Sequence, residues 1–189
     1  FLESKSNPEY LKELTEEIIV KQQKVRDYEQ SFVESEESVE ELVEEAELFR
    51  LLIGDISSQG KGITVSLEDG AYNPSQENPN DYIVHESHVF KVINELKISG
   101  AEAISINGER ITNTTAITCI GNVVKINGEK VGSPFEIKAI GLTAKLYGSL
   151  TMPYGYIDIL KRDGVQVTIE QVEKDTIVIP KFNGVYKFE

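Results

Sequence analysis

Apolar residues recur every seven positions along the N-terminal part of the chain. With Leu11 at heptad position a, every later a position up to Ile53 carries an apolar residue. The d positions are apolar as well, with interruptions at Lys21 and Ser35. A repeat sustained in this way is typical of a coiled coil, and β-branched residues at a with Leu at d favour parallel dimers.

Boundary residues on both sides of this repeat indicate a helix. Asn7 is a preferred N-cap residue, and Pro8 suits the first helical position because its missing N–H would have no helical partner there. Neither Gly nor Pro follows until Gly54, which stands where a C-cap glycine is expected. The sequence therefore predicts one helix from Pro8 to Ile53, about 70 Å long at 1.5 Å per residue.

Charged residues beside the repeat favour the pairing of two such helices. At the g and e′ positions of a parallel dimer, Lys24 meets Glu29 and Glu45 meets Arg50, and both pairs attract. We therefore expect a homodimer through residues 8–53. The alternative is a long amphipathic helix that folds back on its own domain.

After residue 56 the pattern changes to short alternating runs, which indicate strands. Asn107-Gly108 and Gly121-Asn122 separate such runs, and Asn-Gly is a strong hairpin signal because both central residues of a type I′ turn need positive φ. A third turn is expected within residues 127–134. The expected strands are 63–67, four strands of a meander within 101–141, 165–169 and 176–180, and Gly60-Lys61-Gly62 is interpreted as a loop.

Helical periodicity and terminal glycines or prolines predict three further helices, at residues 86–99, 142–150 and 154–162. The first of these stands between two strands, which makes a split β-α-β unit. Residues 68–82 are rich in turn-forming residues and are expected to be a long exposed loop. The predicted fold is α+β: a coiled-coil helix in domain 1–56, then an α/β sandwich in domain 57–189 with helices on one face of a mixed sheet.

Composition narrows the range of partners. The 189 residues carry a net charge of −13, and residues 1–56 hold 16 acidic and 6 basic side chains. This balance repels nucleic-acid phosphates and anionic lipid headgroups, so neither is an expected partner. The single cysteine, Cys119, excludes disulfide frameworks and multi-cysteine zinc clusters. No apolar run approaches the roughly 20 residues that a membrane-spanning helix needs.

The richest cluster of chemically active side chains precedes the helix predicted from residue 86. Both histidines of the chain, His85 and His88, lie there together with Asp81 and Glu86. These are metal-ligand types, but their spacing differs from the H-E-x-x-H pattern of zinc peptidases. Helix capping by His85 or Ser87 explains the cluster more simply, so no metal and no cofactor are expected.

A second candidate site lies at the first predicted hairpin. Asn107, Glu109 and Arg110 would come near His85 at a helix N-terminus, a setting that suits a carboxylate or phosphate. We therefore assign a small-ligand or anion site to His85, Asn107, Glu109 and Arg110, with a turn and a surface ion pair as the simpler interpretation. Cys119 is expected to be a buried strand residue, and an enzyme that uses Cys119 and His85 is a more distant alternative.

Several strings in the second domain are specific enough to suggest a family. They are Tyr82-Ile-Val-His85, Gly100-Ala-Glu-Ala-Ile-Ser-Ile-Asn-Gly-Glu-Arg110, Cys119-Ile-Gly121 and Pro134-Phe-Glu-Ile-Lys-Ala-Ile-Gly141. Through them the chain resembles the YlxW/YlxX-like bacterial family, a domain of unknown function often encoded near cell-division genes. The resemblance spans most of residues 50–180.

The resemblance implies an N-terminal membrane anchor, then a coiled coil, then the α+β domain on the outer side of the cytoplasmic membrane. The chain starts at Phe1 and not at a methionine, so the anchor is expected in a preceding segment. The family brings no catalytic residues to this sequence. We therefore expect a non-enzymatic envelope scaffold or interaction protein linked to cell division, with protein partners in the envelope.

Overall fold

The computed structural model describes residues 8–33, 37–71, 83–121 and 123–183. The chain divides into two compact units, residues 1–49 and 50–189, where the sequence places the boundary after residue 56. The first unit holds helix α1 (Pro8–Val33) and most of helix α2 (Glu37–Ile53). Two helices thus stand where the sequence predicts one, and residues 34–36 and the predicted N-cap Asn7 lie outside the described part.

The C-terminal end of α2 follows the predicted capping pattern. Gly54 has a φ of +85°, a conformation that glycine adopts without the steric penalty of a Cβ atom. Its N–H donates to the Leu51 carbonyl (3.1 Å), and the Asp55 N–H donates to the Arg50 carbonyl (2.8 Å). Two of the last helical carbonyls are therefore satisfied where the chain enters the second unit. None of the described helices is both long and apolar enough to cross a bilayer.

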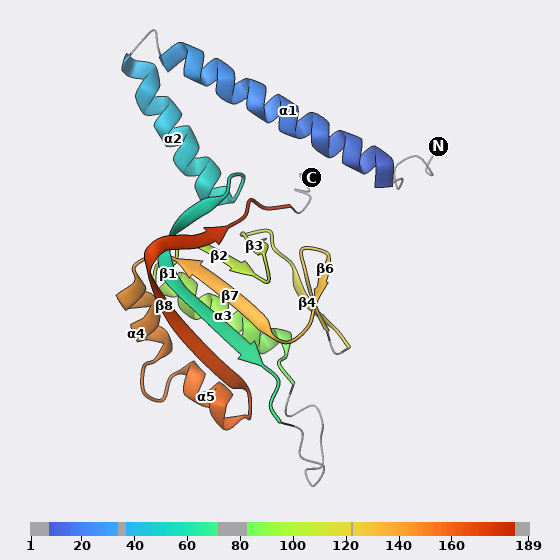
Figure 1. Cartoon of the computed structure of the whole chain (residues 1–189), viewed down its shortest axis with the longest axis vertical. Helices are drawn as coiled ribbons and strands as arrows, with labels where there is room; N and C mark the ends of the chain where they lie inside the picture. The colour runs from blue at the N-terminus through green and yellow to red at the C-terminus, as the bar shows by residue number, and fades with distance from the viewer. Residues whose placement is uncertain (1–7, 34–36, 72–82, 122, 184–189) are drawn as a thin grey trace. The chain divides into compact units, whose positions relative to one another are not determined.

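The second unit is built on a five-stranded sheet with the order β3-β2-β7-β1-β8 (Figure 1). Every pairing in it is antiparallel. The predicted mixed sheet is therefore wrong, because β7 lies between β1 and β2, the two strands that run in the same direction. These two strands and α3 form a strand-helix-strand unit with one strand inserted. The strands are β1 (Ser58–Glu68), β2 (Ala103–Ile106), β3 (Glu109–Ile111), β7 (Phe135–Ile140) and β8 (Gln166–Ile179).

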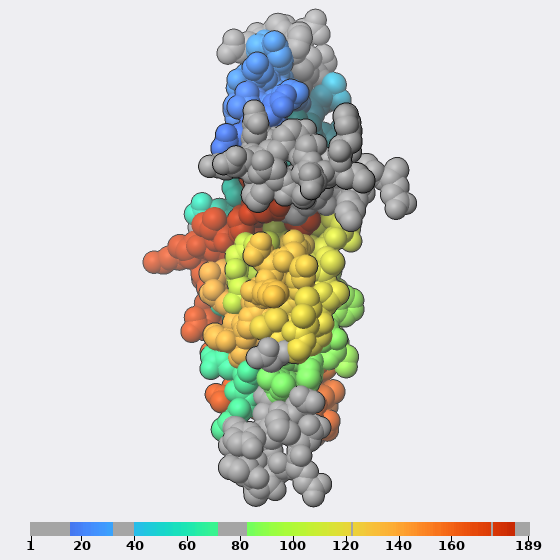
Figure 2. Space-filling view, turned by 90° about the vertical axis from the view of Figure 1, so that its right-hand side faces the viewer, coloured from blue at the N-terminus to red at the C-terminus, as the bar shows by residue number. Residues whose placement is uncertain are grey.

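Residues 101–141, predicted as a four-stranded meander, contribute to two sheets. β2 and β3 form a hairpin at one edge of the large sheet, and a separate three-stranded antiparallel sheet follows. That small sheet consists of β4 (Ile117–Ile120), β5 (Val123–Ile126) and β6 (Glu129–Val131). This sheet, yellow in Figure 2, has one face at the surface of the unit, while Val124 and Ile126 of β5 are buried in the core. The single meander is wrong because hairpin turns specify which neighbours pair, but not which sheet a hairpin joins.

Three helices cover one face of the large sheet: α3 (Glu86–Ile98), α4 (Thr143–Leu150) and α5 (Tyr156–Arg162). Their apolar stripes pack on alternating residues of the central strands, as the period of each element requires. This interface is the main hydrophobic core. Its fully buried members include Ile63, Val65, Leu67, Val89, Val92, Leu96, Ile137, Leu146 and Leu160.

Two strand boundaries differ from the sequence prediction. Gly60-Lys61-Gly62, expected as a loop, lies inside β1, where the register with β8 shifts between Gly60 and Gly62. Strand β8 runs without interruption through residues 166–179, where two strands are predicted. Glycines normally weaken a strand, but Gly62 lies where the backbone of β7 at Ala139 approaches β1 closely.

The two Asn-Gly turns have the predicted backbone geometry. Asn107 and Asn127 have φ values of 47° and 52°, and the following glycines have 86° and 103°. The first turn is also tied to β7, because Asn107 Nδ2 donates to the Pro134 carbonyl and its Oδ1 accepts from the Glu136 N–H, both at 3.0 Å. Asn107 thus helps to fix the position of β7 beside β2.

Candidate functional site

The first turn of α3 is held by groups from two parts of the chain. The extended backbone of His85 (φ −93°, ψ 161°) forms the N-cap, and its N–H donates to Nδ1 of His88 at 3.2 Å. Asp69, just after β1, accepts the Val84 N–H through Oδ1 at 2.8 Å and so orients the chain as it enters the helix. Of the two predicted capping residues, His85 is the N-cap and Ser87 lies inside the helix, and the acceptor His88 is not predicted as part of the cap.

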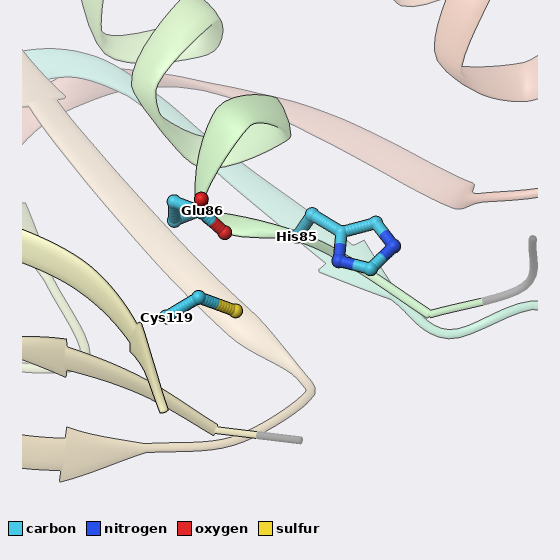
Figure 3. Close-up of side chains that lie close together, drawn as sticks. All are labelled: His85, Glu86 and Cys119. Atoms are coloured by element: carbon cyan, nitrogen blue, oxygen red, sulfur yellow. The ribbon is translucent and has the colours of Figure 1, made fainter. Parts of the chain in front are cut away.

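Strand β4 brings Cys119 to this helix start. The nearest ligand atoms of His85, Glu86 and Cys119 all lie within 4.8 Å of one another. Figure 3 shows these three side chains gathered between the start of α3 and strand β4. Cys119 is exposed, so the expectation of a buried cysteine is wrong. The reason is that β4 belongs to the small sheet at the surface and not to the core of the large one.

Electrostatic interactions within the cluster favour a protonated thiol beside a charged carboxylate. The hydrogen bond from the Cys119 thiol lowers the pKa of Glu86, and the same bond raises the pKa of Cys119. Burial lowers the pKa of His88, and the neighbouring His85 acts in the same direction. A nucleophilic cysteine needs a lowered pKa. The raised pKa of Cys119 therefore opposes the activation that the Cys119–His85 enzyme alternative requires.

The four residues assigned to an anion site do not converge. His85 precedes α3, which packs on the core face of the sheet. Arg110 is the strand partner of Ser105, and both residues belong to the alternating set on the opposite face of the sheet. Asn107 is engaged with β7, as described above. Glu109 Oε2 receives a hydrogen bond from Asn127 Nδ2 at 3.5 Å. The structure therefore groups Asn107, Glu109 and Arg110 in one hairpin and places His85 elsewhere.

Arg110 is almost completely buried, at 2 % exposure. Its Nη1 donates to Ser58 Oγ at 2.8 Å, and its Nη2 donates to the Leu51 carbonyl at 2.9 Å. Leu51 lies in the last turn of α2, where backbone carbonyls need donors and where a positive charge is favourable. Arg110 thus joins the end of α2 to the sheet, a role that the sequence does not reveal because the partners are more than 50 positions away.

The proximity of Glu86 to Cys119 is the feature of the site that the sequence does not predict. His85 and Cys119 are named together as an alternative, but Glu86 is interpreted only as part of the helix start. The distance between Glu86 and Cys119 depends on how the small sheet packs against α3. No spacing rule along the chain predicts that contact.

Comparison with known proteins gives a consistent family signal. The sequence profile of a family described as "Bacterial protein of unknown function (DUF881)" matches residues 45–189. The chain is also 41% identical, over 139 residues, to "UPF0749 protein YlxW" of Bacillus subtilis (strain 168). That match covers 74% of this chain and 60% of the relative, so the chain spans less than two thirds of the relative's length.

A solved structure shares the fold. It is titled "Crystal structure of an uncharacterized conserved protein from Mycobacterium tuberculosis", and it superposes with a TM-score of 0.62 at 23% sequence identity. The match covers 75% of this chain and 94% of that chain. At this identity the similarity concerns the fold alone.

Proposed function

The chain belongs to the DUF881 family of bacterial proteins of unknown function, which includes YlxW-like proteins, and we propose a non-enzymatic role for it. In this proposal the N-terminal helices form a parallel homodimeric coiled coil, and the dimer presents the α+β unit to protein partners in the cell envelope. The link to cell division rests on the family resemblance of the sequence.

The observation that carries the proposal is the exposure of apolar side chains at heptad positions of α1 and α2. Exposed apolar groups in a regular row are normally covered by a partner. A second copy of the chain fits this row, because both copies carry the same seven-residue repeat and the g-to-e′ pairs attract. The a and d residues concerned and their exposures are Ile18 50%, Val25 49%, Tyr28 67%, Leu42 64% and Phe49 55%.

We expect the double substitution Ile18→Asp and Val25→Asp to weaken dimerisation by at least about tenfold, because it places charges in the apolar seam. Sedimentation equilibrium of the full chain at several concentrations measures the dissociation constant. The matched control is Ile19→Asp with Val20→Asp, since these residues are 41% and 54% exposed but occupy positions b and c. A wild-type chain that stays monomeric, or a control that dissociates equally, would contradict the coiled-coil dimer.

The proposal also includes a membrane anchor N-terminal to Phe1, with the α+β unit on the outer side of the cytoplasmic membrane. The strongly acidic chain is repelled by anionic headgroups, so stable membrane attachment would need an inserted segment. We expect the natural full-length gene product to sediment with membranes in 1 M salt and to be released by detergent. Protease added to intact protoplasts should degrade it. Recovery in the soluble cytoplasmic fraction, or protection from the protease, would exclude this placement.

A further inference from the structure

The cluster at the start of α3 has the composition of a transition-metal site. It offers an imidazole nitrogen from His85, a carboxylate oxygen from Glu86 and a sulfur from Cys119. His85 is the N-cap of α3 and Glu86 is its first residue, whereas Cys119 comes from strand β4 of the small sheet. Convergence of three different ligand types from two packed elements is more specific than acidic residues gathered on one surface.

The donor types select the ion. Calcium and magnesium prefer oxygen ligands, and this cluster supplies only one carboxylate. Sulfur and imidazole donors suit Zn²⁺, which takes Cys, His and carboxylate ligands together in four-coordinate sites. The thiolate and the carboxylate carry two negative charges, so they neutralise the charge of a divalent ion. We propose that His85, Glu86 and Cys119 bind one Zn²⁺ ion, with a water molecule as the fourth ligand.

The geometry requires a small closure. In a tetrahedral zinc site with bonds of about 2.0–2.3 Å, ligand atoms lie about 3.3–3.6 Å apart. The three ligand atoms lie within 4.8 Å of one another, so side-chain movements of about 1 Å bring them to these distances. Glu86 is half-buried and Cys119 is exposed, and neither side chain is locked in the core.

Zinc binding releases the thiol proton of Cys119. The Cys119 S–H bond breaks, its proton passes to water or buffer, and the sulfur lone pair forms the bond to zinc. No electron transfer takes place. The ion would then cross-link strand β4 of the small sheet to the first turn of α3, and this link would fix the orientation of the small sheet on the α+β unit.

His88 supports the ring of His85. Its Nδ1 accepts the backbone N–H of His85 at 3.2 Å, and the two ring centroids are 5.5 Å apart with an interplanar angle of 66°. The hydrogen bond fixes the backbone at the N-cap, and the edge-to-face contact limits the space in which the His85 ring can turn. His88 is thus a positioning residue in this proposal and not a ligand.

Calorimetric titration of the full chain with ZnCl₂, in a phosphine reductant that does not chelate the metal, tests the proposal. We expect one ion per chain. Loss of an outer-shell partner typically lowers metal affinity about 10–100-fold. Cys119→Ser and Glu86→Gln each remove a direct ligand, so each should lower the zinc affinity by more than this. Glu95→Gln, on the same helix but outside the cluster, is the matched control and should bind as the wild type does.

Titration with Co²⁺ provides a second readout that does not depend on a variant folding. The wild-type complex should show a thiolate-to-cobalt charge-transfer band, and Cys119→Ser should abolish it. Absence of that band in the wild type would overturn the proposal. Equal zinc affinity of wild type and Cys119→Ser would do so as well, because it would assign the binding to the glutamate-rich N-terminal helices.

Discussion

Replacing Gly62 with alanine is expected to prevent folding of the α+β unit or to lower its free energy of unfolding by at least about 4 kcal/mol. A Cβ atom at this position would overlap the carbonyl oxygen of Ala139 and would lie 2.9 Å from its carbonyl carbon. It would also lie 3.0 Å from the Cα of Ile140. All three atoms belong to the backbone of β7, so no side chain can move to relieve the overlap.

The effect is large because β1 is an interior strand. Gly62 pairs with Ile140 of β7 on one side and with Val172 of β8 on the other. Separation of β1 from β7 to admit a methyl group would break hydrogen bonds at the centre of the sheet and open the core beneath it. Urea unfolding followed by far-ultraviolet circular dichroism measures the loss.

Two other glycines provide a graded comparison. At Gly60 the added Cβ would meet only the Cγ2 methyl of Ile140 at 2.8 Å, which is side chain and can shift, so Gly60→Ala should cost less. At the exposed Gly148 of α4 nothing lies within 4 Å, so Gly148→Ala should be neutral or stabilise the protein by up to about 1 kcal/mol. Equal midpoints for Gly62→Ala and Gly148→Ala would show that β1 and β7 do not approach as closely as described.

Gly62 also illustrates the difference between the parts of the fold that local sequence patterns predict and the parts that depend on distant contacts. Helix α3 and the turns at Asn107 and Asn127 depend on residues within a few positions, so periodicity and turn chemistry place them well. The pairing of β7 with β1 depends on Gly62 and Ala139, which are 77 positions apart in the printed numbering. Local patterns therefore predict Gly60-Lys61-Gly62 as a loop, although tertiary packing places it in a strand.

The candidate site likewise combines residues that local patterns predict with a residue that only a long-range contact brings in. The residue types around His85 form the best set of metal ligands in the sequence, and the cap at the start of α3 is where it is expected. Cys119 joins them only because the small sheet packs against α3, and that packing is not encoded in any motif. Residue types along the chain can thus indicate a candidate cluster, while its complete membership depends on contacts between elements.

Substitution of Arg110 by methionine is expected to lower the free energy of unfolding of the α+β unit by about 2–4 kcal/mol. Methionine retains much of the apolar stem but removes the donors to Ser58 Oγ and the Leu51 carbonyl. Ser58 is 8 % exposed, so its hydroxyl would lose a partner in a place that solvent reaches poorly. The last turn of α2 would also lose the positive charge that favours a helix C-terminus.

Hydrogen exchange locates this loss in the structure. The N–H groups of Gly54 and Asp55 donate to the last carbonyls of α2, so they should exchange faster in Arg110→Met if that turn loosens. The matched control is Arg162→Met, because the Arg162 side chain is 74% exposed and surface changes usually stay within about 0.5 kcal/mol. Equal stability and equal exchange in both variants would show that the hydrogen bonds of Arg110 do not stabilise the end of α2 on the sheet. A loss confined to Arg110→Met would establish instead that this buried cation joins α2 to the sheet, and that the hairpin of Asn107, Glu109 and Arg110 supports the fold.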